Sequence, residues 1–252
     1  ARQLALLSEK RDLTRLANVI QPTAHAGLMF LFYYVISKDA GSGLVYLFVF
    51  VCMAFAAGFA LRWIFLGVGG AVGGFLAAWN LNLLRGDWYG RIKVVLDHSY
   101  DVQGKGFQQT RGLLALGAGG LTGQGLLSGE HIFVPNAWND FIFAYLANVL
   151  GFLGAAAVLL LLFALCLRTL RTGLQCPDAL GCNICVGIFA ALFLQCVINI
   201  GMNLQVLPVI GVTLPFFSAG GSSVVMMYLC VGIVLSVGMN TRRSKLEMQQ
   251  IL

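Results

Sequence analysis

The chain has 252 residues, of which 59% are apolar and only 10% are charged. About a quarter of the residues of a soluble domain are charged, so this composition excludes an ordinary soluble protein. It also excludes disorder, because disordered chains are poor in apolar residues. The net charge of +6 comes from basic residues scattered among apolar blocks. This distribution is typical of basic residues that set the sidedness of membrane loops, so we predict no nucleic-acid partner.

Long apolar runs follow one another along the chain. A helix needs about 20 apolar residues to cross the bilayer core. A shorter, glycine-rich run at 112–127 predicts a weaker additional span. We therefore predict an all-α polytopic membrane protein of about seven transmembrane helices, in a single domain over residues 1–252. The six strong spans are 21–36, 43–61, 63–84, 140–166, 182–204 and 222–239.

Two stretches beside these spans have their own patterns. Residues 1–20 alternate leucines with charges, which predicts an interfacial amphipathic segment, and Pro22 stands where the first span opens. The sequence QVLPVIGVTLPFFSAGGSS between the last two spans is too apolar for an exposed loop. We predict a re-entrant segment near 205–222, because irregular backbone at membrane depth must be covered by protein or line a water-filled cavity.

Basic residues predict the sidedness of the loops. Residues 85–111 contain five basic residues and residues 128–139 contain none. We therefore expect 85–105 to be cytoplasmic, 128–139 to be an extracytoplasmic loop and 240–252 to be a cytoplasmic tail. This arrangement leaves the four basic residues of 1–20 outside, against the rule.

Asp140 is the most informative charged residue, at the junction of a loop and a long span. It could simply cap the helix, since aspartate is a good N-cap. However, the chain has only ten acidic residues, and an ionisable group at the membrane face is a functional candidate by default. The three histidines show no spacing for metal ligation, so we predict no metal site formed by the protein alone.

Five stretches of sequence resemble the SEDS family, the group of RodA, FtsW and SpoVE. PNAWND at 135–140, continuing as FIFAYLANVLG, resembles P-x-x-H-T-D-F-I-F-A…E-E-L-G. LPVIGVTLPFFSAGGSS at 207–223 resembles L-P-V-T-G-V-P-L-P-F-x-S-Y-G-G-S-S, and GFQQTRGLLALGAGGLTGQGL at 106–126 resembles G-Y-Q-x-x-Q-S-x-x-A-x-x-x-G-G-L-x-G-x-G-L. IQPTAHAGL at 20–28 and KDAGSGLV at 38–45 resemble the weaker Q-P-S-E-x-A-K-L and P-D-L-G-T-A-L-V.

The resemblance implies the last seven helices of a ten-helix fold in the bacterial cytoplasmic membrane. It implies polymerisation of lipid II into glycan strands at the outer face, with release of undecaprenyl-pyrophosphate, in cell division, elongation or sporulation. It also implies a class B penicillin-binding protein as partner and a catalytic aspartate at Asp140. Substrate contacts would then fall on Gln21, Pro22, Asp39, Arg62, Gln108, Pro135, Pro215, Ser218, Gly220, Gly221 and Ser222.

The chain departs from the family pattern near Asp140. The His-Thr before the aspartate is Trp138-Asn139, the Glu-Glu pair is Asn148-Val149, and the Gln-Ser of the third block is Arg111-Gly112. These changes leave two alternatives open: a lipid II transporter or flippase, which would need charged pairs within its spans, and a catalytically inactive scaffold for a penicillin-binding protein.

The implied reaction needs a base and a cationic group. Asp140 would take the proton of the acceptor sugar hydroxyl, and general bases typically contribute about 10²–10⁴-fold. The charge of the leaving pyrophosphate needs a positive partner. Since 128–139 contains no lysine or arginine, we expect Arg62, a divalent cation such as Mg²⁺ or Mn²⁺, or the partner protein to supply it.

Overall fold

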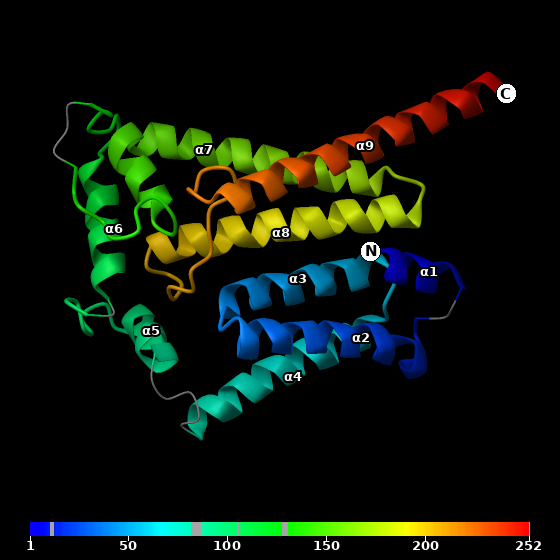
Figure 1. Cartoon of the computed structure of the whole chain (residues 1–252), viewed down its shortest axis with the longest axis horizontal. Helices are drawn as coiled ribbons and strands as arrows, with labels where there is room; N and C mark the ends of the chain where they lie inside the picture. The colour runs from blue at the N-terminus through cyan, green and yellow to red at the C-terminus, as the bar shows by residue number, and fades with distance from the viewer. Residues whose placement is uncertain (11–12, 82–86, 105, 128–130, 252) are drawn as a thin grey trace. The chain divides into compact units, whose positions relative to one another are not determined.

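The computed structural model describes residues 1–10, 13–81, 87–104, 106–127 and 131–251, and the regular structure in them is helical (Figure 1). The helices, in chain order, are α1 Arg2–Lys10, α2 Leu16–Leu31 with a π-helical continuation η1 Phe32–Ile36, α3 Ala40–Ala56, α4 Leu61–Asn80, α5 Asp87–Leu96, α6 Phe107–Ala118, α7 Ile142–Leu174, α8 Ala179–Asn203 and α9 Gly221–Ile251.

Five of these helices are long and apolar enough to cross a membrane: α2 with η1, α4, α7, α8 and the part of α9 up to Arg243. Helix α3 is apolar and slightly shorter, at 17 residues. The chain is therefore an all-α, multi-pass membrane protein, as the sequence predicted. The expected tail at 240–252 continues α9 as helix through Ile251.

The predicted span at 112–127 is wrong. Helix α6 has 12 residues and ends at Ala118, so it is only about 18 Å long, against a bilayer core of about 30 Å. The chain then turns, and Gly120, Gly123 and Gly125 all have positive φ. These glycines adopt left-handed backbone that a right-handed helix cannot continue through.

The N-terminal region also differs from its prediction. Helix α2 begins at Leu16, so Pro22 is buried inside the helix instead of opening it. The predicted interfacial segment 1–20 is divided between α1 and the first turns of α2. Leu4 and Leu13 are buried in a cluster with Phe59, so protein, and not only lipid, covers the apolar side of this segment.

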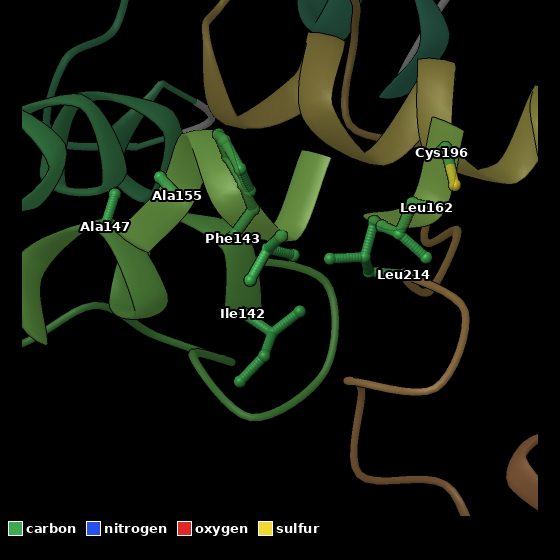
Figure 2. Close-up of a cluster of buried hydrophobic side chains, with 8 residues drawn as sticks. Ile142, Phe143, Ala147, Ala155, Leu162, Cys196 and Leu214 are labelled. Carbon is green, nitrogen blue, oxygen red and sulfur yellow. The ribbon is translucent and has the colours of Figure 1, made fainter. Parts of the chain in front are cut away.

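The chain forms two compact units, each described here by itself. The first comprises residues 1–72, 164–194 and 225–252, and the second comprises 73–163 and 195–224. The core of the second unit gathers side chains from α7, α8 and the connection 204–220, among them Phe143, Cys196 and Leu214 (Figure 2). This unit contains Asp140 and most of the predicted site.

Helix α7 is interrupted at Gly151, where φ is 69° and ψ is −173°. The turn 119–125 provides the missing backbone partners: the N–H groups of Gln124 and Gly125 donate to the carbonyls at 148 and 149, and those of Phe152 and Leu153 donate to the carbonyls at 120 and 121. Such pairing is what allows a broken helix at membrane depth.

The connection 204–220 between α8 and α9 is not helical, as the re-entrant prediction required. Arg91 of α5 donates to its Val209 carbonyl, and ring Nε2 of His98 lies 3.3 Å from its Gln205 carbonyl oxygen.

The predicted opposite sidedness of 85–105 and 128–139 is therefore wrong. On α6, Gln109 donates to the Leu207 carbonyl and Arg111 to the Phe133 carbonyl. The described parts of both segments thus meet the same end of α7 and α8, and no span separates them. Residues 85–86, 105 and 128–130 lie outside the described part of the chain.

Candidate functional site

Asp140 lies just before α7, which begins at Ile142. Its backbone carbonyl accepts hydrogen bonds from Nδ2 of Asn199 at 2.9 Å and of Asn203 at 3.0 Å, two buried side chains of α8. Its carboxylate faces the connection 204–220, since a Cβ built on Gly211 would lie 3.9 Å from Asp140 Oδ2. The end of α8 thus fixes the backbone of Asp140 beside the connection.

Helix α7 has a cap that does not depend on the Asp140 side chain. Asn203 Oδ1 accepts a 3.0 Å hydrogen bond from the backbone N–H of Ala144, the third residue of the helix. An N-cap side chain accepts from the second or third N–H of its helix. Because α8 supplies this bond, one N–H of the first turn of α7 is capped whatever the Asp140 carboxylate contacts.

Ser218 joins the connection 204–220 to the residues just before Asp140. Its Oγ donates to the Asn139 carbonyl at 2.7 Å and accepts from the Leu214 N–H at 2.8 Å. The N–H of Ala219 donates to the Trp138 carbonyl at 2.7 Å. Asn199 also donates to the Val212 carbonyl at 2.8 Å, so the middle and the second half of the connection are fastened to α8 and to residues 138–140.

Gln109, the residue after the predicted substrate contact Gln108, binds the connection. Gln109 is buried, and its side-chain amide nitrogen Nε2 donates to the carbonyls of Met202 at 3.1 Å and Leu207 at 2.8 Å. Gln108 is half-buried. The sequence contains a usable signal, because Gln109, Gly112 and Ala115 recur every three residues on one face of α6 and all three are buried.

A second polar group lies at the loop before Asp140. Asn148 is buried and donates to the Ala115 carbonyl through Nδ2, so its Oδ1 accepts from Nδ1–H of His131 at 2.9 Å. The rings of His131 and Trp138 both lie on Tyr145, with centroids 5.9 and 5.2 Å away. Asn148 occupies a position where the family motif has a glutamate, and here it fixes the histidine ring.

Five more predicted residues lie in the turn before Asp140, in the second half of the connection or at the start of α9. Pro135 is half-buried in the turn before Asp140, and Pro215 is buried. Gly220 precedes α9, and its carbonyl accepts from the Val224 N–H and from Ser223 Oγ. Gly221 and Ser222 are exposed in the first turn of α9.

The other predicted contacts belong to the first unit. Gln21 is exposed on α2 and Pro22 is buried there. Asp39 caps α3 by accepting from the Ser42 N–H at 3.0 Å. Arg62 donates to the Thr14 carbonyl at 2.7 Å and lies over the Trp63 ring. Their roles toward a substrate stay predictions.

The two asparagines of α8 were missed as site residues. Asn199 and Asn203 are four residues apart in an apolar span, so they share one helix face, and a polar pair of this kind in a membrane must find partners in protein. Among the described residues no group of three His, Cys, Asp or Glu side chains could hold a metal ion.

Comparison with known proteins adds a family to this geometry. The family model described as cell cycle protein, of the FtsW, RodA and SpoVE group, matches residues 3–243. Stage V sporulation protein E of Bacillus subtilis (strain 168) is 37% identical over 242 residues, 94% of this chain and 64% of the relative. A probable peptidoglycan glycosyltransferase FtsW of Geobacter sp. (strain M18) is 33% identical over 222 residues, 85% of this chain and 58% of the relative.

Solved structures agree with the sequence relatives. A chain of a peptidoglycan synthase complex that coordinates polymerization and crosslinking matches with a TM-score of 0.73 and 27% identity, over 94% of this chain and 66% of that one. The rod shape determining protein RodA of Thermus thermophilus matches with a TM-score of 0.59 and 26% identity, over 94% of this chain and 62% of RodA. The chain thus spans about three fifths of the length of its relatives, and it belongs to the FtsW/RodA/SpoVE family of cell cycle proteins.

Proposed function

We propose that this chain forms the catalytic part of a peptidoglycan glycosyltransferase, which polymerises lipid II at the outer face of the bacterial cytoplasmic membrane. Its partner would be a class B penicillin-binding protein, which cross-links the new strands. The main support from the structure is the setting of Asp140: buried amides of α8 fix its backbone, and its carboxylate faces the connection 204–220. The relatives named as probable peptidoglycan glycosyltransferases support the same activity.

The proposed reaction transfers a glycosyl group between two lipid-linked sugars. Asp140 accepts the proton of the acceptor hydroxyl as its oxygen bonds to the anomeric carbon of the donor. The bond from that carbon to the pyrophosphate oxygen breaks, and the polyprenyl pyrophosphate leaves with the electron pair.

The revised spans also improve the proposed topology. Without a span at 112–127, one face carries the whole connection between α4 and α7 together with 204–220. Counting the remaining spans back from a cytoplasmic C-terminus puts residues 1–15, with four basic residues, inside, which agrees with the positive-inside rule. The same count puts Arg62 at the cytoplasmic face, away from a substrate on the outer face.

Cysteine labelling tests this topology. In a variant without native cysteines, a cysteine placed at His98 and one placed at His131 should both react with a membrane-impermeant maleimide added outside intact cells. A cysteine at Arg62 is the control and should react only after permeabilisation. Labelling of position 131 without position 98 would contradict the arrangement.

The activity itself is tested at Asp140. Asp140→Asn keeps the size and hydrogen-bonding shape of the side chain and removes its basicity. The protein, joined to the part of Bacillus SpoVE that the chain does not cover and co-expressed with its penicillin-binding protein, should polymerise purified lipid II, and Asp140→Asn should reduce the rate by at least about a hundredfold.

Two outcomes would oppose the assignment. An Asp140→Asn variant that polymerises at the parental rate excludes Asp140 as the base. A parental protein that binds the penicillin-binding protein but makes no polymer would favour the scaffold, in line with the replacement of a motif carboxylate by Asn148.

A further inference from the structure

We infer that Arg91 and Arg111 together form an anion site for the pyrophosphate of a polyprenyl-linked substrate, beside Asp140. The inference rests on the proposed function, and it identifies the positive charge that the leaving group needs. The sequence left this charge to Arg62, to a cation or to a partner protein.

Arg91 reaches the site from α5. It is half-buried, and its Nη1 donates to the Val209 carbonyl. Val209 is two residues before Gly211, the position that the Asp140 carboxylate faces. The Arg91 guanidinium and the carboxylate of the proposed base therefore both face the short stretch 209–211.

Arg111 reaches the site from α6. It is half-buried, and its Nε donates to the Phe133 carbonyl at 3.0 Å. One turn further along α6, Ala115 is buried in a cluster with Val134 and Phe141, the residue after Asp140. Val209 packs on the same cluster, so the carbonyls that hold the two arginines belong to adjoining segments.

Each guanidinium group has five N–H donors, of which one donates in the bonds described above, and each accepting group is a neutral carbonyl. Among the side chains that the structure describes, which do not include those at 87 and 130, neither arginine has a carboxylate partner. A partly buried cation is stabilised by an anion, and the planar fork of arginine fits phosphate oxygens in pairs.

The identity of residue 111 separates this chain from the pattern that it resembles. The family block has Gln-Ser where this chain has Arg111-Gly112. The additional positive charge lies in the same unit as a site from which two motif carboxylates have been lost, at 148 and 149. Arg111 therefore gives this chain an anion ligand that the motif itself does not contain.

The test measures binding separately from polymerisation. Radiolabelled undecaprenyl pyrophosphate is titrated into the protein in phosphatidylcholine nanodiscs. Arg111→Gln, which restores the motif residue, and Arg91→Gln should each weaken binding about tenfold, because a charge-assisted hydrogen bond to phosphate is lost. Arg168→Gln, at an exposed position of α7 in the first unit, is the matched control and should bind like the parent.

Further arms identify the anion and keep the result interpretable. Phosphatidylglycerol in the nanodisc should compete weakly; equal competition would show a general phospholipid headgroup site and overturn the assignment. Arg111→Lys, which keeps the charge without the fork, should be intermediate, and thermal unfolding in detergent shows that each variant is folded. If Arg91→Gln does not fold, Arg111→Gln decides the question, and unchanged binding in that variant refutes the proposal.

Asp140→Asn separates this inference from the proposed function. It should bind the pyrophosphate at least as well as the parent while losing polymerisation, because a negative charge beside the anion site is removed. A variant that still polymerises would refute the base but not the anion site, whereas undiminished binding in the arginine variants would refute the anion site but not the base.

Discussion

Two of the non-helical stretches in the second unit, 119–125 and 204–220, find their hydrogen bonds in different ways. The turn 119–125 meets the interruption of α7 at Gly151 with backbone N–H and carbonyl groups. The connection 204–220 is held by side chains, including Asn199, Gln109, Ser218 and Arg91. Both satisfy backbone that lipid could not.

This difference in hydrogen bonding explains why 204–220, and not 119–125, is a candidate for a catalytic role. Backbone-to-backbone pairing brings the chains so close that side chains have no room, and a Cβ on Gly123 would lie 2.1 Å from the Val149 carbonyl oxygen. The side-chain contacts of 204–220 instead concentrate amide, hydroxyl and guanidinium groups around Asp140. The first stretch is a joint within the fold, and the second surrounds a reactive group.

The largest effect on folding should come from Gly123→Ala. The added Cβ collides with backbone that cannot move aside, and φ at this position is +84°. Overpacking and left-handed backbone together should lower the free energy of unfolding by about 2–5 kcal/mol. Unfolding in mixed detergent–SDS micelles measures the change. Gly120→Ala is matched, since its φ is +55° but nothing lies within 4 Å of the new Cβ; equal losses in both variants would exclude close approach as the reason.

A smaller loss is expected from Asn203→Ala in the other stretch. The side chain bonds both the Asp140 carbonyl and the Ala144 N–H, and leaving buried groups unpaired costs about 1–3 kcal/mol. Polymerisation should fall as well, because the backbone of Asp140 loses a support. Asn183→Ala in the same helix is the control: its Nδ2 bonds only the Ala179 carbonyl within α8, and it should leave polymerisation unchanged. The same SDS titration and the lipid II assay give both readings.

The smallest effect should come from Ser218→Ala. Its Oγ joins the connection to the Asn139 carbonyl, and an ordinary hydrogen bond contributes about 1 kcal/mol. Ser222→Ala, at an exposed position in the first turn of α9, should stay within about 0.5 kcal/mol of the parent. Apparent melting temperatures in detergent compare the two variants. A greater loss of stability in Ser222→Ala would mean that the hydrogen bonds of the connection do not determine which substitution destabilises the protein more.

The sequence alone determined the class of fold and the most important segments. Long apolar runs predicted the helices that can span a membrane, because the bilayer sets a minimum length that composition reveals. Two prolines in an apolar stretch predicted the non-helical connection, since each proline lacks the N–H that a helix interior uses and disfavours helix there. The block around Asp140 needed no structure to be found, because its motif is local.

Only the tertiary structure decided what surrounds Asp140. The glycines at 119–125 fit a membrane helix or a tight turn equally well by composition, and the choice depended on the interruption of α7 that they pair with. Basic residues at 91 and 111 resembled a cytoplasmic loop until their contacts with the carbonyls at 209 and 133 placed them beside the site. A local pattern records which residues can form a helix, but the partners of a side chain are set by segments far away in the chain, whose packing no single stretch of sequence contains.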